Sequence, residues 1–211
     1  MKYKCIIFDC DGVLVDSETI SNKTLVDMAK TVGVTLDYDF VMTHFLGKSL
    51  QYCFDYIEHL APQKLPDTFE TEFRERTFEA FRTQMQPIPG VHELLSKIKI
   101  DVAVASNGPA EKIRLNLTTT NLIDRFEGNI FSAYDINSWK PNPELYLHAA
   151  KSMGYDVKDC VVIEDSLAGV QAALAGGFSV FGYRNPHNKD LFKEINIPLF
   201  DDMSILDRLL V

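Results

Sequence analysis

The stretch that decides the fold is residues 3–14, YKCIIFDCDGVL. It opens with a short apolar run that ends at Phe8 and continues with two aspartates, Asp9 and Asp11, the second followed by a glycine. A continuous apolar run of this length, closed by an Asp-Gly pair, predicts a buried strand that ends in a turn. Residues 3–8 are therefore predicted to form a buried strand, with both aspartates at its carboxyl end.

The chain beyond this strand has a helical pattern as far as residue 86. Apolar residues recur at helical spacing, and a glycine and two prolines separate the segments. The predicted helices cover residues 17–33, 41–46, 50–60 and 68–85. Because no convincing strand pattern lies among them, we interpret residues 16–86 as an α-helical cap domain inserted into the fold.

Strands and helices alternate once the prolines and glycine of residues 87–90 have ended the last cap helix. Asn142 is predicted to cap a helix that Pro143 begins. Such alternation predicts a parallel sheet covered on both faces, so residues 1–15 and 87–211 are expected to form a Rossmann-like, three-layer α/β core. The predicted strands cover 102–105, 130–132, 161–163 and 179–181, and the predicted helices 91–98, 109–119, 143–153 and 166–175, before a short strand and helix.

The composition is ordinary for a globular protein, with 46% hydrophobic and 24% charged residues among 211. A net charge of −9 without a basic stripe argues against a nucleic-acid partner. The four cysteines form no metal-binding pattern, which favours free thiols in a reducing compartment. The first apolar run is too short for a signal peptide, and no stretch is long enough to span a bilayer. We expect a cytoplasmic protein without a membrane partner. The sequence leaves the oligomeric state open, and a monomer is compatible with it.

Polar side chains gather after the predicted strands, where the active site of an open parallel sheet lies. Converging carboxylates repel one another unless a cation lies among them, and their oxygens suit Mg²⁺. A lysine and small donors opposite the metal suit a phosphoryl group. One carboxylate can then attack phosphorus, while a second protonates the leaving alcohol and later activates water. The residues are Asp9 and Asp11, Ser106 and Asn107, Lys140, and Glu164 and Asp165.

The same residues give the chain a family resemblance that covers nearly its whole length. Residues 6–14, IIFDCDGVL, resemble the first motif of the haloacid dehalogenase superfamily. Its second, third and fourth motifs are matched in order by Ser106-Asn107, by Lys140 and by Glu164-Asp165. A helical cap directly after the first motif resembles the phosphoglucomutase-like branch of that superfamily.

The resemblance implies a Mg²⁺-dependent phosphatase and a role for each residue. It implies Asp9 as nucleophile, Asp11 as general acid and base, and Ser106, Asn107 and Lys140 as ligands of the phosphoryl group. It also implies Mg²⁺ bound by the Asp9 carboxylate, the Asp11 backbone carbonyl and Asp165, with Glu164 as a candidate further ligand.

A narrower likeness concerns the substrate, expected to be a small phosphorylated metabolite. Residues 131–136 (FSAYDI), 139–141 (WKP) and 186–189 (PHNK) are similar to those of bacterial 6-phosphogluconate phosphatases. The core motifs bind only the phosphoryl group. We therefore expect Ser21 and Lys48 of the cap to contact the distal end of the substrate. A lysine there favours a carboxylate, which makes 6-phosphogluconate the best single guess.

Alternative functions stay open at this point. A sugar-phosphate mutase of this branch would, by resemblance, carry a histidine where this chain has Ser21, and a second basic residue near Lys48. A dehalogenase has no use for Asp11 as an acid, and a non-catalytic phosphate-binding protein needs no nucleophile such as Asp9. His187 is the one histidine that we single out, without assigning it a role.

Overall fold

The structure of the chain is a computed structural model that describes residues 2–45, 48–185, 188 and 191–210. The interpretation of His187, and of the PHNK segment apart from Asn188, therefore lies outside the described residues. The chain divides into two compact units, which we call the core (Met1–Asp16 and Gln86–Val211) and the cap (Ser17–Met85). The expected junctions after residues 15 and 86 lie one residue from these.

The core contains a six-stranded sheet in which every neighbouring pair is parallel, in the order β3-β2-β1-β4-β5-β6. The sheet is the one that the alternation of strands and helices predicts. In its middle, Ile7 of β1 pairs with Ala103 of β2 on one side and with Val162 of β4 on the other. The strands are β1 (Cys5–Phe8), β2 (Asp101–Ser106), β3 (Ile130–Ser132), β4 (Cys160–Glu164), β5 (Ser179–Tyr183) and β6 (Leu199–Phe200).

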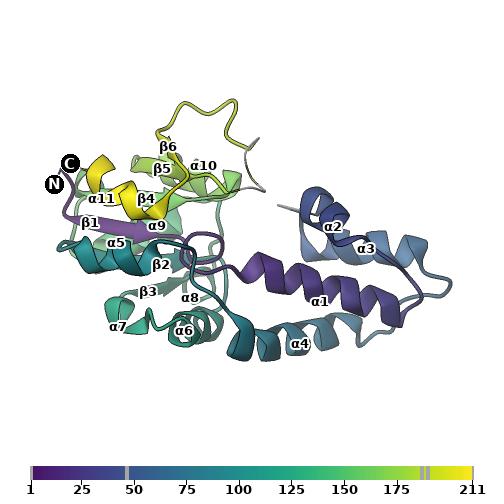
Figure 1. The fold of residues 1–211 in the computed structure, drawn as a ribbon. Coiled ribbons are helices and arrows are strands. Elements are labelled where there is room, and N and C mark those ends of the chain that lie inside the picture. Colours follow the sequence, from purple (N-terminus) through teal and green to yellow (C-terminus); the bar gives the residue numbers. More distant parts are fainter. Residues whose placement is uncertain (1, 46–47, 186–187, 189–190, 211) are drawn as a thin grey trace. The chain divides into compact units, whose positions relative to one another are not determined.

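Helices lie on both faces of this sheet (Figure 1). Every residue of β1 is fully buried because its alternate side chains enter two different layers. Ile7 belongs to an apolar cluster with Tyr146 and Val170, whereas the Phe8 ring meets Phe126 edge-on at 6.1 Å. The helices of the core are α5 (Val91–Lys97), α6 (Ala110–Thr119), α7 (Ile123–Phe126), α8 (Ala133–Ile136), α9 (Glu144–Ser152), α10 (Leu167–Ala175) and α11 (Leu206–Leu209), with 3₁₀ turns at Val157–Asp159 and Met203–Ile205.

The described residues of the cap form four helices, and none of these residues lies in a strand. Its own apolar cluster includes aromatic side chains, where the Phe54 ring lies 5.4 Å from Phe69 and 5.6 Å from Phe73. A cluster of this kind lets the inserted segment bury its apolar surface internally. The helices are α1 (Ser17–Thr31), α2 (Tyr38–His44), α3 (Leu50–Leu60) and α4 (Phe69–Gln84).

The two chain segments that join the units run beside each other within the core. The Asp16 amide donates to the Gln86 carbonyl at 2.9 Å, and the Ile88 amide donates to the Leu14 carbonyl at 3.0 Å. Val15 and Pro87 form an antiparallel bridge between these contacts. The core chain therefore leaves for the cap and returns from it at one place.

The starts of five helices differ from prediction, that of α2 by three residues and those of α4, α6, α9 and α10 by one. Helix α9 begins at Glu144, and Pro143 rather than Asn142 occupies its N-cap position, without a side-chain hydrogen bond. Helix α2 begins at Tyr38 rather than residue 41, because the Asp37 carboxylate accepts a hydrogen bond from the Phe40 amide at 2.9 Å and so caps an earlier turn.

The four cysteines are all free, as the sequence predicts, and all four are buried. Among the residues that the structure describes, no helix combines the length and the apolarity that crossing a membrane requires.

Candidate active site

The carboxyl ends of β1, β2 and β4 bring the predicted polar residues of the core together. Asp9 directly follows β1, and Ser106 is the last residue of β2. Glu164 is the last residue of β4, and Asp165 follows it. Because these strands are parallel neighbours, their polar ends meet at one edge of the sheet.

Lys140 lies at the centre of the site. Its ammonium group donates to Asp9 Oδ1 at 2.5 Å and to Glu164 Oε1 at 2.8 Å, and its side chain is only 3% exposed. The Asn107 side chain fixes the Lys140 backbone, since its Oδ1 accepts from the Lys140 amide at 2.9 Å and its Nδ2 approaches the Lys140 carbonyl at 3.4 Å. Asn107 thus orients Lys140, a contact that the sequence does not indicate, and its role toward a phosphoryl group stays a prediction.

The carboxylate of Glu164 accepts four hydrogen bonds from described residues. Its Oε1 accepts from Lys140 and from the Tyr146 hydroxyl at 3.0 Å, and its Oε2 accepts from the Ser166 amide at 2.7 Å and hydroxyl at 2.9 Å. A carboxylate has about four acceptor positions, so these donors fill them. Glu164 lies close enough to share a metal with Asp9 and Asp165, but a metal bound to it would have to displace one of its donors.

A glycine of α10 makes room for this carboxylate. A Cβ atom on Gly169 would lie 1.5 Å from Glu164 Oε1, closer than any side chain can come. The helix therefore approaches the buried carboxylate on a face that has no side chain at this position.

Asp165 is held by the loop that follows β5. Asn188 Nδ2 donates to the Asp165 carbonyl at 2.8 Å, and Asn185 Nδ2 approaches Asp165 Oδ2 at 3.4 Å. On its other side the carboxylate lies against Gly12, where a Cβ atom would come within 2.1 Å of Oδ2. Gly12 also has a φ of +84°, so both the turn after β1 and the approach of Asp165 require a glycine.

Asp11 is contacted by helix α6. Its Oδ2 accepts from the Lys112 ammonium at 2.9 Å, and the Asn116 amide approaches its Oδ1 at 3.4 Å. The Asp11 side chain is 26% exposed, so it is the more accessible of the two aspartates after β1.

The charges of the site fit a divalent cation. Asp9, Glu164 and Asp165 each offer an oxygen within 4.8 Å of the others, and all three are buried. Burial raises the pKa of Asp9 to about 7, against the opposing influence of Lys140, and the neighbouring Glu164 and Asp11 raise it further. Together with Asp11, four carboxylates face the two ammonium groups of Lys140 and Lys112, which leaves an excess of two negative charges when all are ionised. One divalent cation would balance that excess, and oxygen ligands suit Mg²⁺.

Lys140 and Cys10 keep their ordinary protonation states in this site. Burial lowers the pKa of Lys140, but Asp9 and Glu164 more than offset it and hold the pKa well above the usual value. Burial raises the pKa of the Cys10 thiol, as do the flanking carboxylates Asp11 and Asp9, so this cysteine is a protonated, unreactive thiol.

The predicted residues of the cap belong to the other unit. Lys48 is exposed, and its ammonium group lies 5.5 Å from the centre of the Tyr52 ring. Ser21 is half-buried on α1. Their contact with a substrate stays a prediction.

Sequence reasoning missed several residues that contact the site. Lys112 and Asn116 lie about a hundred residues from Asp11 along the chain and look like ordinary helical polar residues. Tyr146 has the spacing of an apolar helix face, and Gly169 stands inside a helical pattern. A glycine within a predicted helix, directly after the Glu164-Asp165 motif, is the one signal that could have indicated a close approach.

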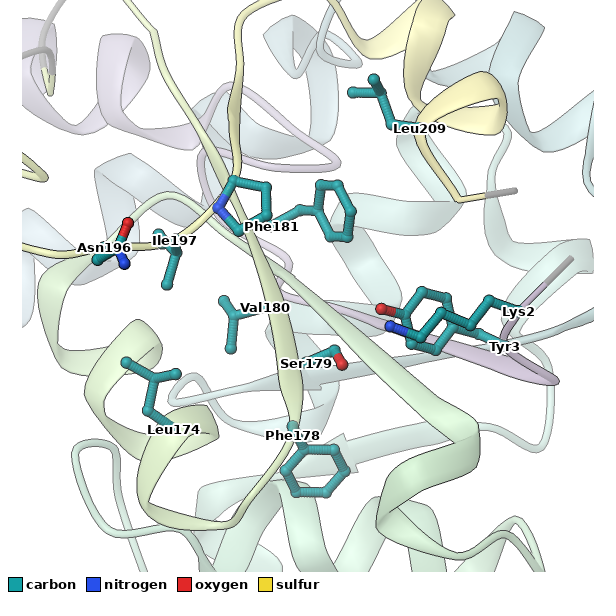
Figure 2. Close-up of a pocket in the computed structure, with 11 residues that line it drawn as sticks. Lys2, Tyr3, Leu174, Phe178, Ser179, Val180, Phe181, Asn196, Ile197 and Leu209 are labelled. Atoms are coloured by element: carbon teal, nitrogen blue, oxygen red, sulfur yellow. The ribbon is translucent and has the colours of Figure 1, made fainter.

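The pocket in Figure 2 is separate from this site. It has a volume of about 420 Å³, and its described lining includes Tyr3, Ser179 and Ile197. Tyr3 precedes β1 and Ser179 begins β5, so the pocket lies toward the amino ends of these strands, whereas Asp9 lies at the carboxyl end.

Comparison with known proteins gives a consistent assignment. Residues 3–177 match the hydrolase family described as haloacid dehalogenase-like hydrolase. The chain is 36% identical over 192 residues to the 6-phosphogluconate phosphatase of Escherichia coli strain K12, covering 90% of this chain and 87% of that protein. It is 30% identical over 174 residues to hexitol phosphatase B of the same organism, covering 80% and 78%.

A solved structure shows the same fold. It is a haloacid dehalogenase-like protein from Agrobacterium tumefaciens, which superimposes with a TM-score of 0.88 at 26% identity and covers 99% of this chain and 97% of that one. The family match over residues 3–177 and these relatives indicate the same fold. The parallel sheet, with polar residues at the carboxyl ends of its strands, agrees with that fold. The chain therefore belongs to the haloacid dehalogenase-like hydrolases, as an enzyme of phosphatase type.

Proposed function

We propose that this enzyme is a Mg²⁺-dependent phosphatase that hydrolyses a small phosphate monoester through an aspartyl-phosphate on Asp9. One observation carries the proposal: the Asp9 carboxylate is bound by the buried ammonium of Lys140, within reach of Asp165, while Asp11 stands two residues away in a more accessible position.

In the first half of the reaction, an Asp9 carboxylate oxygen attacks phosphorus and the ester P–O bond breaks. The departing alkoxide takes a proton from the Asp11 carboxyl group, so that the free alcohol leaves. Lys140 neutralises charge on the phosphoryl oxygens, and the Ser106 hydroxyl, which accepts from the Gly108 amide at 3.1 Å, can donate its own proton to them.

In the second half, Asp11 takes a proton from water, and the water oxygen attacks phosphorus. The bond between phosphorus and the Asp9 oxygen breaks, which releases inorganic phosphate and regenerates the Asp9 carboxylate. Asp11 is thus an acid in one step and a base in the next.

Asp9, Asp165 and the Asp11 backbone carbonyl are the groups that we propose to hold Mg²⁺. The ion would supply positive charge beside the transferring phosphoryl group. Glu164, whose four acceptor positions are filled by protein donors, holds Lys140 in place rather than binding the ion directly.

We propose a phosphorylated sugar acid, 6-phosphogluconate, as the substrate. Support comes from the 36% identity to an enzyme named for that activity and from the exposed Lys48 of the cap. A mutase on the same scaffold has less support, because the first cap helix carries Ser21 where that reaction would use a histidine.

The test is the release of inorganic phosphate from 6-phosphogluconate and from glucose 6-phosphate, with Mg²⁺ and with EDTA. We expect Mg²⁺-dependent release, with the higher kcat/KM for 6-phosphogluconate. Release that survives EDTA unchanged would refute the metal requirement, and a preference for glucose 6-phosphate would refute the substrate assignment. Conversion to an isomeric sugar phosphate without net phosphate release would show a mutase instead.

A further inference from the structure

Two side chains of α6 contact the carboxyl group of Asp11. Lys112 and Asn116 are four residues apart, so they lie on one face of the helix. Lys112 Nζ lies 2.9 Å from Asp11 Oδ2, and Asn116 Nδ2 lies 3.4 Å from Asp11 Oδ1. Each oxygen of the carboxyl group therefore faces its own donor from the same helix.

The approach of Lys112 is guided by the turn after β2. A Cβ atom on Gly108 would lie 3.5 Å from Lys112 Cδ, 3.5 Å from Ser106 Oγ and 3.9 Å from Asp11 Oδ2. The lysine side chain thus passes over Gly108, beside the hydroxyl that we propose to bind the phosphoryl group. Its side chain is 22% exposed, so its pairing with Asp11 is better shielded from water than an ion pair on the surface.

Asn116 is fully buried beneath this contact. Its Nδ2 points to Asp11, whereas its Oδ1 is buried and meets no donor in the described part of the chain. Leaving a buried amide oxygen without a partner costs stability, and an apolar residue would avoid that cost. The position is thus better explained by its contact with Asp11 than by packing.

We propose that Lys112, supported by Asn116, is a positioning residue that fixes the Asp11 carboxyl group for proton transfer to the leaving oxygen. The inference rests on the proposed function, in which Asp11 is the acid. A carboxyl group on a loop can rotate about two bonds, and a general acid is effective only within hydrogen-bond reach of the oxygen that it protonates. Two donors from one rigid helix restrict that rotation.

The proposal predicts an effect that depends on the leaving group. Phenolate needs a proton more than p-nitrophenolate does, while the two aryl phosphates are similar in size. Lys112→Met keeps most of the length of the side chain but removes the donor. We expect this variant to lower kcat/KM for phenyl phosphate about tenfold more than for p-nitrophenyl phosphate, because misplaced acid catalysis affects the poorer leaving group.

Three further variants complete the experiment. Lys112→Arg retains a cationic donor and should restore most of the ratio between the two substrates. Arg114→Met removes a cation from the same helix that pairs with Glu127 at 3.0 Å, away from Asp11, and should leave the ratio unchanged. Lys112→Ala, which also removes the donor, carries the comparison if the methionine variant does not fold.

The possible outcomes distinguish failure of the positioning role from failure of the proposed function. Equal losses on both substrates in Lys112→Met, with an unchanged unfolding midpoint, would overturn the positioning role while leaving the phosphatase intact. A wild type that hydrolyses neither aryl phosphate nor any sugar phosphate would overturn the proposed function, and the positioning role with it.

Discussion

At the scale of single residues, the site places a carboxylate where ionisation is costly. Asp9 is buried, and its main compensation within the chain is one ammonium group, Lys140, which Glu164 shares. Removing one partner of such a buried network leaves uncompensated charge, which destabilises strongly. The chemistry of Asp9 is therefore best tested by a substitution that preserves its size and its hydrogen bonds.

Asp9→Asn is that substitution. We expect loss of turnover to background with little change in the fold, because an amide of the same shape cannot attack phosphorus. Steady-state phosphate release measures the first effect, and circular dichroism with thermal unfolding measures the second. The covalent mechanism would be wrong if a folded Asp9→Asn enzyme kept near-normal activity.

The raised pKa of Asp9 predicts how stability varies with pH in the metal-free protein. The pKa is about 7 in the folded chain, mainly through burial, against an ordinary value of 3.8. Between these values the folded state retains a proton that the unfolded chain has released, so the stability contributed by this group falls as pH rises through the window. Above about pH 7 the effect levels off.

Urea unfolding of the wild type and Asp9→Asn in EDTA, from pH 4 to pH 8, isolates this contribution. We expect the free energy of unfolding of the wild type, relative to the variant, to decrease with pH up to about 7. A difference that stays constant, or grows with pH, would contradict the assignment of a raised pKa to Asp9.

Asp165 offers a direct test of the metal site. Asp165→Ala removes a ligand that Gly12 leaves room for, so we expect the Mg²⁺ concentration for half-maximal activity to rise by at least about tenfold. Mg²⁺ titration by calorimetry gives the same comparison without turnover. Ca²⁺ should inhibit the wild type, because it prefers a larger and looser oxygen shell. Unchanged affinity in both measurements would remove Asp165 from the site.

Local motifs predicted the residues that follow strands, and could not predict those that reach the site from helices. Asp9, Glu164 and Asp165 stand at strand ends, where topology alone brings them together. Lys112 and Asn116 reach Asp11 only because α6 has a particular orientation, which no local pattern encodes. The same limit applies to Asn107, whose place in a motif suggested a ligand while its side chain holds the Lys140 backbone.

At the scale of elements, α10 supports the site because it has no side chain at Gly169, where it packs against Glu164. Alanine favours a helix over glycine by about 1 kcal/mol, so propensity alone predicts that Gly169→Ala is stabilising. The added methyl group would instead push Glu164 from its donors, and each hydrogen bond to a charged group contributes about 1.5–3 kcal/mol. The displacement outweighs the propensity.

We therefore expect Gly169→Ala to lower the free energy of unfolding by roughly 2 kcal/mol or more, and to lower activity by misplacing Lys140. Chemical denaturation and phosphate release measure the two effects. Gln171→Ala, on the exposed face of the same helix, is the matched control and should change stability by no more than about 0.5 kcal/mol. A Gly169→Ala enzyme as stable as the wild type would show that Glu164 can move freely.

Helix positions were easier to predict than helix starts. Long helices such as α4 can be recognised in the sequence from the helical spacing of their apolar residues. Helices α7 and α8 have four residues each, which is too few to show such a period. The start of α9 differs from the predicted one by a single residue. Pro143 already has a helical backbone conformation, with a φ of −74° and a ψ of −13°, so the helix can be counted from either residue.

At the scale of the whole molecule, chemistry and selectivity are assigned to different units. The core holds every residue of the proposed phosphoryl chemistry, and the cap holds Ser21 and Lys48, which we propose to recognise the substrate. If Lys48 recognises the carboxylate of a sugar acid, Lys48→Ala should lower the preference for 6-phosphogluconate over glucose 6-phosphate by about tenfold or more, since a charge-assisted hydrogen bond contributes about 1.5–3 kcal/mol.

The ratio of kcat/KM for the two sugar phosphates is the measurement, and kcat/KM for p-nitrophenyl phosphate is the internal control. The latter should stay near its wild-type value, because that compound has no carboxylate. Lys64→Ala, at another exposed lysine of the cap, is the matched variant. An unchanged ratio in Lys48→Ala would mean that a different part of the enzyme selects the substrate.

The adjacent entry and exit of the cap have a consequence for how such a protein can change. Because Asp16 and Gln86 are joined by a hydrogen bond of 2.9 Å, the 69 residues of the cap leave the core and rejoin it at one place. A short turn could close the same gap, since the entropy of loop closure changes only slowly with loop length. Recombination could therefore remove, exchange or enlarge the insert without building a new hydrophobic core. The catalytic core and the inserted recognition unit could then change independently of each other.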